Sequence, residues 1–275
     1  MKAIAMPARH TLFDESTILY LKHMLIRTPL EAPARYLQRL AKVSKLLRYP
    51  ELIQLHLEGE RIARVMAREL RADSNCVDVG CHIGSMLSLF LRLSPKGTHW
   101  AFEPVATKAN WLRKKFPEVE VREVALSNQP GSATFYEDLT RPGFSGLRRP
   151  DGQDRSIEYQ VDCARADALI PRDHRVDLIK LDVEGAELMV LEGAVETIRR
   201  SRPLVLFECG PRGPQKFGIE PKDLYRFITR ELGYRLRTPA GQLRGAPPLS
   251  LAEFEHTQIY PFTAFNFFAT PTTAA

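Results

Sequence analysis

The sequence predicts an α/β fold built on a mostly parallel sheet that helices cover on both faces. From Ser74 onward, short apolar runs alternate with patterns of helical period, which is the order of strands and crossover helices in a parallel sheet. Two of the apolar runs end in acidic residues followed by glycine, as strands do where they lead into helices beside a ligand. The 275 residues, of which 44% are hydrophobic and 26% charged, suffice for one large domain and an appendage.

Residues 1–72 are predicted to form a helical N-terminal extension that caps the main domain. Helices are expected at 17–27, after Pro33, and from Leu52 to Leu70. The middle helix carries a basic face formed by Arg35, Arg39, Lys42, Lys45 and Arg48. This face suits docking on a membrane surface or on a partner. Most amphipathic helices simply pack one face on a core, and we favour that interpretation.

Residues 73–275 are predicted to form the main domain. In chain order we expect strand 76–80, helix 84–93, strand 98–103, helix 106–116, strand 119–125, strands 133–138 and 157–163, strand 176–182, helix 185–200, strand 203–209, helix 221–232, strand 233–238 and a last strand within 263–270. Phenylalanines at 262, 265, 267 and 268 mark the last strand as buried on both faces.

The strands at 133–138 and 157–163 are predicted to form a hairpin insertion with an unusually long loop, 139–155. The loop is rich in glycine, proline and arginine, and it contains Arg141, Phe144, Arg148, Arg149 and Arg155. Loops of this length often act as lids over a ligand. Two interpretations stay open: closure over an anionic or sugar-like molecule, and a solvated mobile hairpin.

The most informative motif is Cys76-Val77-Asp78-Val79-Gly80-Cys81-His82-Ile83-Gly84. It is typical of a buried strand that ends in a glycine turn and opens a helix, where backbone and helix N–H groups approach a nucleotide-type cofactor. The dinucleotide fingerprint requires a further glycine where His82 stands, and Asp78 would repel a pyrophosphate. A carboxylate at this place suits the cationic amino-acid end of S-adenosylmethionine.

A second acid supports the same cofactor. Glu103, in Ala101-Phe102-Glu103-Pro104, ends the next predicted strand, and an acid about 20 residues after the glycine turn can accept hydrogen bonds from both ribose hydroxyls. The glycine turn alone would also fit a tight strand–helix junction without a ligand. Together with Glu103, it predicts a cofactor pocket.

A third segment brings more acids to the same edge of the sheet. It reads Asp177-Leu178-Ile179-Lys180-Leu181-Asp182-Val183-Glu184-Gly185-Ala186-Glu187-Leu188. Asp182 and Glu184 follow one buried strand, and Glu208 ends the neighbouring strand. Ligands of open α/β sheets lie outside the carboxyl ends of the strands, so Asp78, His82, Asp182, Glu184 and Glu208 are expected to converge there. Clustered carboxylates raise one another's pKa, which is one way to obtain a catalytic base. Glu187 fits better as a favourable charge at a helix N-terminus.

Together these segments resemble the FkbM-type family of S-adenosylmethionine-dependent methyltransferases. The specific part of the resemblance is the block Lys180-Leu181-Asp182-Val183-Glu184-Gly185-Ala186-Glu187, supported by Val77–Gly84, Phe102-Glu103-Pro104, Ala125-Leu126-Ser127-Asn128 before Gly131, and Glu192-Gly193-Ala194. The similarity covers about residues 74–270 and leaves residues 1–72 outside it. Cys81 stands where the family more often has alanine.

The resemblance implies a class I methyltransferase fold, a Rossmann-like arrangement with seven strands in a mostly parallel sheet. It implies that Asp78, Gly80 and Gly84 line the methionine end of the cofactor, that Glu103 binds the ribose, and that Ala125 and Leu126 lie near the adenine. His82 and Asp182, in the same crevice, are expected to contact the cofactor as well. The implied reaction is O-methylation of a hydroxyl on a sugar or secondary metabolite, so the acceptor is a small molecule or a glycan.

Methyl transfer from a sulfonium depends mainly on alignment of the acceptor oxygen, and a hydroxyl also needs a base. The candidates for the base are Asp182, Glu184, His82 and Glu208, and we prefer Asp182 with His82 as its partner. Alternatively, a divalent metal held by Asp182 and Glu208 lowers the pKa of the hydroxyl. The sequence does not choose between the two.

Three other functions remain to be weighed. The net charge of +6 and the pI near 9.2 suit an RNA methyltransferase, but acids beside the acceptor would repel a phosphate backbone. That class also uses a Pro-Pro-aromatic turn or a Pro-Cys nucleophile, neither of which follows Asp182, and no aromatic–basic stacking platform is present. An NAD-dependent oxidoreductase lacks its third glycine here. A non-catalytic cofactor-binding module that docks through the basic N-terminal helix is the alternative from another class.

The remaining sequence features concern the cellular setting. The cysteines at 76, 81, 163 and 209 form no CxxC pair and favour a reduced, cytoplasmic protein. The N-terminal segment is too short for the apolar region of a signal peptide, and no apolar run approaches a membrane span. The oligomeric state stays open, with a homodimer as one arrangement.

Overall fold

The computed structural model describes residues 25, 28–31, 33, 49–139, 145–149, 156–211 and 213–272. The predicted helices at 17–27 and after Pro33, with the basic face, therefore lie outside the described residues apart from single positions. The third predicted helix is present as a short turn η1 (Pro50–Leu52), α3 (Ile53–His56) and α4 (Glu58–Glu69). In the part of the chain that is described, no helix is both long and apolar enough to cross a membrane. The division at residue 72 stays a prediction.

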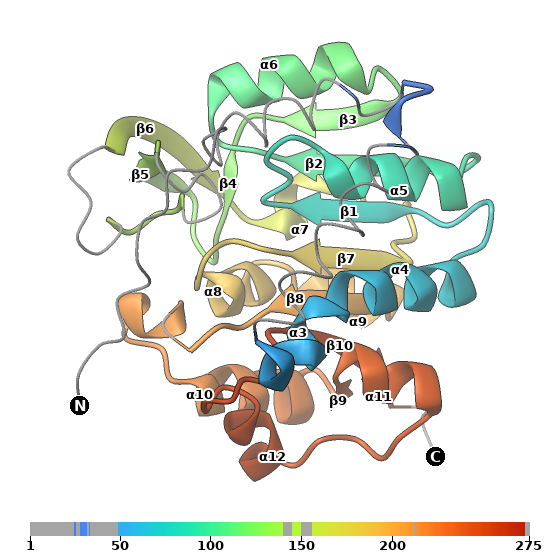
Figure 1. Ribbon diagram of the computed structural model, residues 1–275. Coiled ribbons are helices and arrows are strands. Elements are labelled where there is room, and N and C mark those ends of the chain that lie inside the picture. The colour runs from blue at the N-terminus through green and yellow to red at the C-terminus, as the bar shows by residue number, and fades with distance from the viewer. Residues whose placement is uncertain are drawn as a thin grey trace.

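A seven-stranded sheet forms the centre of the molecule, in the order β3-β2-β1-β7-β8-β10-β9 (Figure 1). The strands are β1 (Cys76–Val79), β2 (His99–Phe102), β3 (Val119–Arg122), β7 (Leu178–Leu181), β8 (Leu204–Glu208), β9 (Tyr234–Arg237) and β10 (Asn266–Pro271). Five neighbouring strands, β3, β2, β1, β7 and β8, run parallel to one another, and β10 is antiparallel to both β8 and β9. This arrangement confirms the predicted seven-stranded, mostly parallel sheet.

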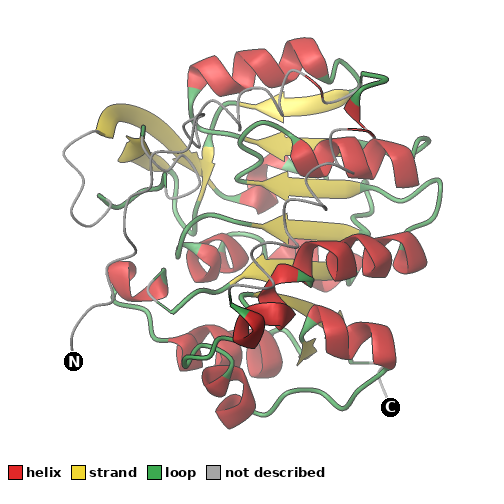
Figure 2. Cartoon of the chain, viewed as in Figure 1, coloured by secondary structure: helices red, strands yellow, loops and turns green. Residues whose placement is uncertain are grey.

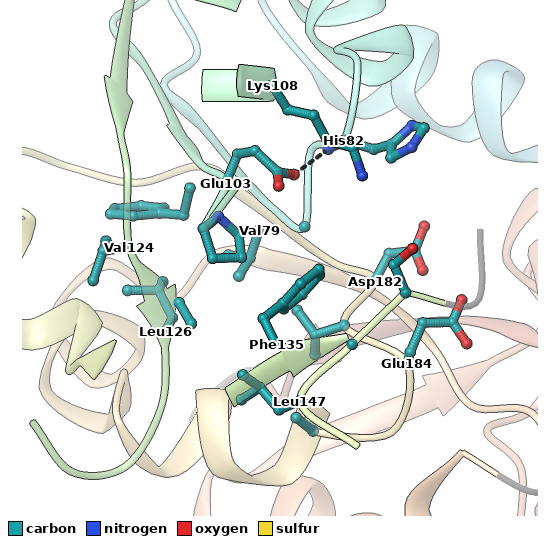
Figure 3. Close-up of a pocket in the computed structure, with 18 residues that line it drawn as sticks. Val79, His82, Glu103, Lys108, Val124, Leu126, Phe135, Leu147, Asp182 and Glu184 are labelled. Carbon is teal, nitrogen blue, oxygen red and sulfur yellow. Dashed lines mark hydrogen bonds between the residues drawn. The ribbon is translucent and has the colours of Figure 1, made fainter. Parts of the chain in front are cut away.

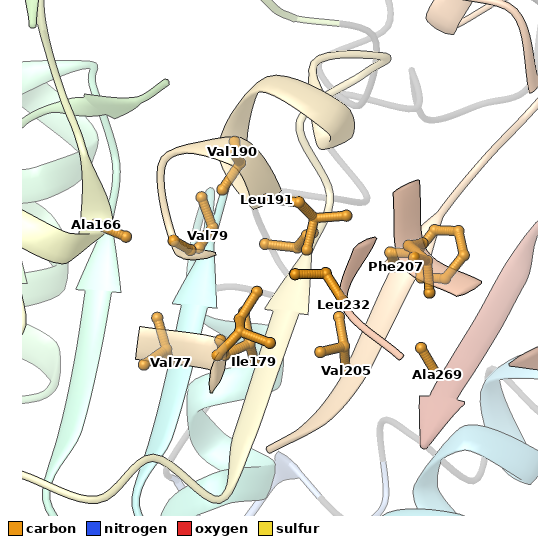
Figure 4. Close-up of a cluster of buried hydrophobic side chains, with 14 of the residues drawn as sticks. Val77, Val79, Ala166, Ile179, Val190, Leu191, Val205, Phe207, Leu232 and Ala269 are labelled. Carbon is orange, nitrogen blue, oxygen red and sulfur yellow. The ribbon is translucent and has the colours of Figure 1, made fainter. Parts of the chain in front are cut away.

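Helices cover both faces of the sheet (Figure 2). On one face, α4, α5 (Ser85–Leu93) and α6 (Ala106–Lys115) pack their apolar side chains against Cys76, Ala101 and Leu178 of the strands. On the other face, α7 (Ala166–Leu169), α8 (Glu187–Glu192), α9 (Val195–Ser201) and α10 (Pro221–Arg226) cover a second cluster that contains Val77 and Ile179 (Figure 4). Because successive side chains of a strand point to opposite faces, neighbours such as Cys76 and Val77 belong to different clusters.

The predicted hairpin insertion is also present, as part of a second, smaller sheet. β5 (Gly131–Asp138) and β6 (Ser156–Ala164) pair antiparallel, and the two-residue strand β4 (Ala125–Leu126) pairs parallel with β6. The sequence pattern merged β4 with the strand before it, whereas the structure ends β3 at Arg122. Within the long loop, Gly146 exchanges backbone hydrogen bonds with Tyr136 of β5, at N···O distances of 2.8 and 3.0 Å.

Several predicted boundaries were wrong. The helix expected at 185–200 is two helices, α8 and α9, separated at Gly193. A Cβ at Gly193 would lie 2.1 Å from the Ser127 carbonyl oxygen, so glycine lets the end of α8 pack closely on the segment after β4. The short helices η3 (Pro214–Phe217), α11 (Pro239–Arg244) and α12 (Leu251–His256) were not predicted. The helix at 221–232 continues beyond α10 as a π-helical turn, η4 (Phe227–Glu231).

Candidate functional site

A pocket opens where β1, β2 and β7 end at the same edge of the sheet (Figure 3). Its walls surround about 700 Å³ of space, part of which is open to solvent. One part of its wall is apolar and the other is polar. Figure 3 shows Val124 and Leu126 on one side and Asp182 and Glu184 on the other, with Phe135 between them. The pocket therefore suits a molecule with one apolar end and one polar end.

The glycine turn after β1 forms part of this pocket and is shaped by close packing. Gly80, His82 and Gly84 all have positive φ angles, of 71°, 50° and 78°. A Cβ at Gly80 would lie 1.9 Å from the Asp182 carbonyl oxygen, so glycine lets the ends of β1 and β7 approach. A Cβ at Gly84 would lie 2.4 Å from the ring of Phe116. Gly80 and His82 line the pocket, whereas Gly84 packs beside it.

Asp78 lies below the pocket and faces a buried lysine. β1 and β7 pair with Asp78 opposite Lys180, and the Lys180 Nζ lies 3.1 Å from Asp78 Oδ1. Within the described part of the chain neither Asp78 oxygen makes a hydrogen bond of good geometry, so the contact is an ion pair only. Asp78 is fully buried and is not among the residues lining the pocket. Its role as a direct cofactor ligand stays a prediction.

The electrostatics of this pair follow from its burial. Burial raises the pKa of Asp78, and the ammonium of Lys180 opposes that rise. Burial alone would lower the pKa of Lys180, but the carboxylates of Asp78 and Asp182 raise it above its usual value. Lys180 therefore stays charged. Sequence reasoning did not select Lys180, although a charged residue inside an apolar strand was the signal that could have found it.

Glu103 follows β2 and points into the pocket, where two backbone groups hold it. The N–H of His82 donates to Oε2 at 3.0 Å, and the N–H of Val105 donates to Oε1 at 3.1 Å. The residue is only 3% exposed, and burial raises the pKa of its carboxyl group to about 7, against the effect of Lys108. Each carboxylate oxygen can accept a further hydrogen bond. Glu103 is thus a fixed acceptor at the wall of the pocket.

Acidic side chains gather at the ends of β7 and β8. Asp182 and Glu184 line the pocket, and Asp182 Oδ2 lies 3.4 Å from Lys180 Nζ. Burial, followed by the charge of Asp182, raises the pKa of Glu184 to about 8. The same two causes raise the pKa of Glu208 well above its usual value. The charges of Asp182 and Glu184 act on Glu208, but Glu208 does not line the pocket.

Glu187 is a structural member of the same cluster. It is 1% exposed, and its Oε1 accepts hydrogen bonds from the N–H groups of Val183 and Gly185 at 3.1 and 3.3 Å. Burial raises the pKa of its carboxyl group to about 7. Glu187 holds the turn that presents Glu184, whose φ is +56°. This agrees with the expectation that Glu187 stabilises the start of the helix.

The insertion closes the apolar side of the pocket. Phe135 of β5 and the loop residues Ser145, Gly146 and Leu147 line it, beside the predicted adenine neighbours Ala125 and Leu126. Sequence reasoning missed Phe135 and Leu147. Phe135 reaches the pocket through the pairing of β5 with β6, and Leu147 through the pairing of Gly146 with Tyr136 of β5. Arg141, Phe144 and Arg155 lie outside the described residues. Closure of the whole loop over an acceptor stays a prediction.

The described residues contain no group of three or more His, Cys, Asp or Glu side chains arranged to hold a metal ion. The predicted pair of Asp182 and Glu208 would supply two ligands. The roles of Asp182, Glu184, His82 and Glu208 as bases likewise stay predictions, although the structure brings all four to one edge of the sheet.

Comparisons with known proteins match this chain to methyltransferases. A family model described as the methyltransferase FkbM domain matches residues 78–236, more than half of the chain. A 2-O-methyltransferase, NoeI, from Sinorhizobium fredii (strain NBRC 101917 / NGR234) is 30% identical over 154 residues, which cover 48% of this chain and 62% of that protein. Methyltransferase 1 from Beauveria bassiana (strain ARSEF 2860) is 35% identical over 147 residues, covering 44% and 58%. The matched region thus spans about three fifths of the length of these curated relatives.

Two solved structures are similar to this chain at much lower identity. An FkbM methyltransferase from Methylobacillus flagellatus KT is 16% identical, with a TM-score of 0.43 over 73% of this chain and 44% of that chain. SMU.1697c, a putative methyltransferase from Streptococcus mutans in complex with SAH, is 10% identical, with a TM-score of 0.43 over 78% and 98%.

Proposed function

The chain belongs to the FkbM methyltransferase family, and from that premise we propose that it transfers the methyl group of S-adenosylmethionine to a hydroxyl of a sugar or secondary metabolite. Family membership gives the methyltransferase class, whereas the cofactor, the acceptor atom and the kind of acceptor are the proposal. The name of one relative, a 2-O-methyltransferase, supports oxygen as the acceptor atom. The observation that carries the proposal is the division of the pocket into an apolar half and an acidic half.

The residues of the pocket fit S-adenosylmethionine. Val124, Leu126 and Phe135 offer apolar surface for the adenine, and Glu103 offers free carboxylate lone pairs for the ribose hydroxyls. Among the described lining residues Lys108 is the one lysine or arginine, and its Nζ is paired with Glu137 Oε1 at 2.8 Å. Among the described residues of the pocket a pyrophosphate would find no unpaired lysine or arginine, which favours this cofactor over a dinucleotide.

The acidic half would serve the acceptor. When bound, S-adenosylmethionine supplies an electrophilic methyl carbon on a positively charged sulfur. Asp182, with 39% of its side chain exposed, is placed to accept the proton of an acceptor hydroxyl as the new oxygen–carbon bond forms. His82 lines the same wall and is proposed as its partner. Glu184, with a pKa near 8, would still hold its proton at neutral pH and could donate to a second hydroxyl.

The same acids count against an RNA acceptor. A phosphate backbone would have to approach the carboxylate of Asp182, which lines the pocket, and repulsion between like charges opposes that approach. A neutral polyol meets no such barrier, and its hydroxyls can both donate and accept hydrogen bonds. We therefore propose a small-molecule or glycan acceptor.

The first test is calorimetric titration of the protein with S-adenosylmethionine, beside the Glu103→Gln variant. We expect micromolar-range binding by the wild type, weakened at least tenfold in the variant, because charge-assisted hydrogen bonds are worth about 1.5–3 kcal/mol. The Glu120→Gln variant is the control, since Glu120 is an exposed partner of Arg122 on β3. Absence of binding by the wild type, with binding of NAD or RNA instead, would overturn the proposal.

Positive binding justifies a screen of hydroxylated acceptors with radiolabelled cofactor, run with and without EDTA. A rate that EDTA leaves intact contradicts the version in which Asp182 and Glu208 hold a divalent metal. A rate that EDTA abolishes and Mg²⁺ restores contradicts the version in which Asp182 alone acts as the base.

A further inference from the structure

Lys180 is a buried cation to which the proposed reaction assigns no role. It lies in the middle of the parallel sheet on β7, between β1 and β8, and is 8% exposed. Burying an ammonium group is costly unless partners surround it. An apolar residue would suit this strand position better for stability alone, so the contacts of Lys180 indicate what the charge is for.

The contacts of Lys180 join two parts of the pocket. Its Nζ donates a hydrogen bond to the carbonyl oxygen of Gly80, at 3.0 Å, in the turn that lines the cofactor side. The same Nζ lies 3.4 Å from Oδ2 of Asp182, which lines the acceptor side. Its third contact, to Asp78 at 3.1 Å, lies beneath both.

Lys180 cannot act directly on a ligand in this arrangement. It is not among the residues that line the pocket, so its ammonium reaches a bound molecule only through Gly80 or Asp182. Nor can it serve as a base, because the flanking carboxylates raise its pKa above the usual value for lysine. Any part that it plays in the reaction must therefore pass through its neighbours.

We propose that Lys180 is a positioning residue that fixes the Asp182 carboxylate relative to the glycine turn of the cofactor pocket. This inference rests on the proposed function, since it assigns Asp182 to the acceptor and Gly80 to the cofactor. One ammonium that contacts both holds the two halves in a set geometry, and small displacements of reacting groups reduce methyl transfer steeply. Asp78 keeps the ammonium in place from below.

The competing explanation is structural: Lys180 merely neutralises Asp78 inside the sheet. The two explanations differ when both charges are removed together. Removing a buried ion pair as a unit is often neutral for stability, whereas removing one partner strands the other. A double variant, Lys180→Met with Asp78→Asn, therefore keeps the fold but lacks the link between Gly80 and Asp182.

The test compares wild type and double variant by urea denaturation, by calorimetric titration with S-adenosylmethionine, and by crystallography. We expect similar unfolding midpoints, at least tenfold weaker cofactor binding in the variant, and an Asp182 carboxylate that has left its wild-type position. A stable double variant with wild-type cofactor affinity and an unmoved Asp182 would overturn the positioning role.

A second variant covers the case in which the methionine variant does not fold. Lys180→Gln with Asp78→Asn keeps an amide N–H that can donate to Gly80 but no charge that attracts Asp182. Here we expect displacement of Asp182, and an undisplaced carboxylate would contradict the inference. If the wild type itself fails to bind S-adenosylmethionine, the proposed function is wrong and this inference is wrong with it. If the wild type and the double variant bind the cofactor equally and Asp182 has not moved, only the inference is wrong.

Discussion

The burial of Glu103 affects the protonation state of a side chain that is expected to bind the cofactor. Its carboxyl group is nearly inaccessible, yet it borders the pocket and is held by two backbone N–H groups. Burial raises its pKa to about 7, so near neutral pH the empty pocket holds a mixture of protonated and ionised Glu103. Ribose hydroxyls that donate to this side chain would bind the ionised form.

Cofactor affinity should therefore fall as the pH falls below about 7. If the bound form requires the carboxylate, a pKa near 7 makes binding about tenfold weaker at pH 6 than at pH 8. Calorimetric titrations with S-adenosylmethionine at both pH values measure this ratio. In Glu103→Gln binding should be weak at both values and the ratio close to one, whereas Glu184→Gln should keep most of the wild-type ratio. A wild-type affinity that does not change between pH 6 and 8 contradicts the prediction.

Asp182 carries the second prediction at this scale. If it takes the proton of the acceptor, Asp182→Asn should lower the rate of methyl transfer by about 10²–10⁴, because an amide cannot accept that proton. Rates are measured with the acceptor that the screen yields, at saturating cofactor. Glu123→Gln, at an exposed ion pair with Arg113, is the matched control and should keep the wild-type rate. Near-normal turnover by Asp182→Asn would assign the base to another side chain.

At the scale of elements, the sequence was sufficient to predict those strands and helices that are determined by their own residue pattern. The strands β1, β2, β7 and β8 and the helices between them follow from apolar runs and glycine turns. The structure brings Gly80, His82, Glu103 and Asp182, which follow these strands, to one pocket. What could not be predicted depends on contacts between distant segments. Gly193, near the break between α8 and α9, packs closely on Ser127, and Leu147 reaches the pocket through the pairing of Gly146 with Tyr136.

The glycine turn gives a prediction that separates packing from ligand approach. Gly80→Ala should destabilise the protein by more than about 2 kcal/mol even without cofactor, because φ is positive and the new Cβ would collide with backbone of Asp182. Gly59→Ala, at an exposed position inside α4 with no atom within 4 Å of the added Cβ, should instead stabilise by about 0.5–1 kcal/mol. Urea denaturation of the two variants measures both effects. Wild-type stability of Gly80→Ala would show that the strand ends can separate freely.

At the scale of the whole molecule, the parallel sheet concentrates acids at one edge. Glu184, Glu187 and Glu208 lie close enough at the ends of β7 and β8 to share the charge of Asp182 as a neighbour, and Glu103 is buried at the end of β2. The pKa of each is raised, first by burial. Functional sites often retain such unfavourable groupings at a cost in stability.

The stability of the protein without ligand should therefore rise as the pH falls from 8.5 to 6.5. A carboxyl group whose pKa is higher in the folded than in the unfolded chain binds its proton more tightly when folded. Its stabilising effect is complete below the unfolded value of about 4.5 and is lost as the pH rises through the folded values, which are about 7 for Glu103 and Glu187 and about 8 for Glu184. Below pH 6.5 the buried His99, whose pKa is lowered by burial, opposes the trend because its protonation favours unfolding.

Scanning calorimetry across this window should show Tm rising by several degrees towards pH 6.5, since about 1 kcal/mol shifts the Tm of a domain this large by roughly 2–4 °C. The Glu208→Gln variant removes one acid from the cluster, so its Tm at pH 8.5 should exceed that of the wild type and its slope with pH should be smaller. Glu255→Gln, an exposed acid on α12, is the control and should follow the wild-type curve. A wild-type Tm that peaks at pH 8.5 would mean that the acids are ionised and well paired in the folded protein. The acidic edge would then act as a preformed anionic site that favours a cationic acceptor over a neutral polyol.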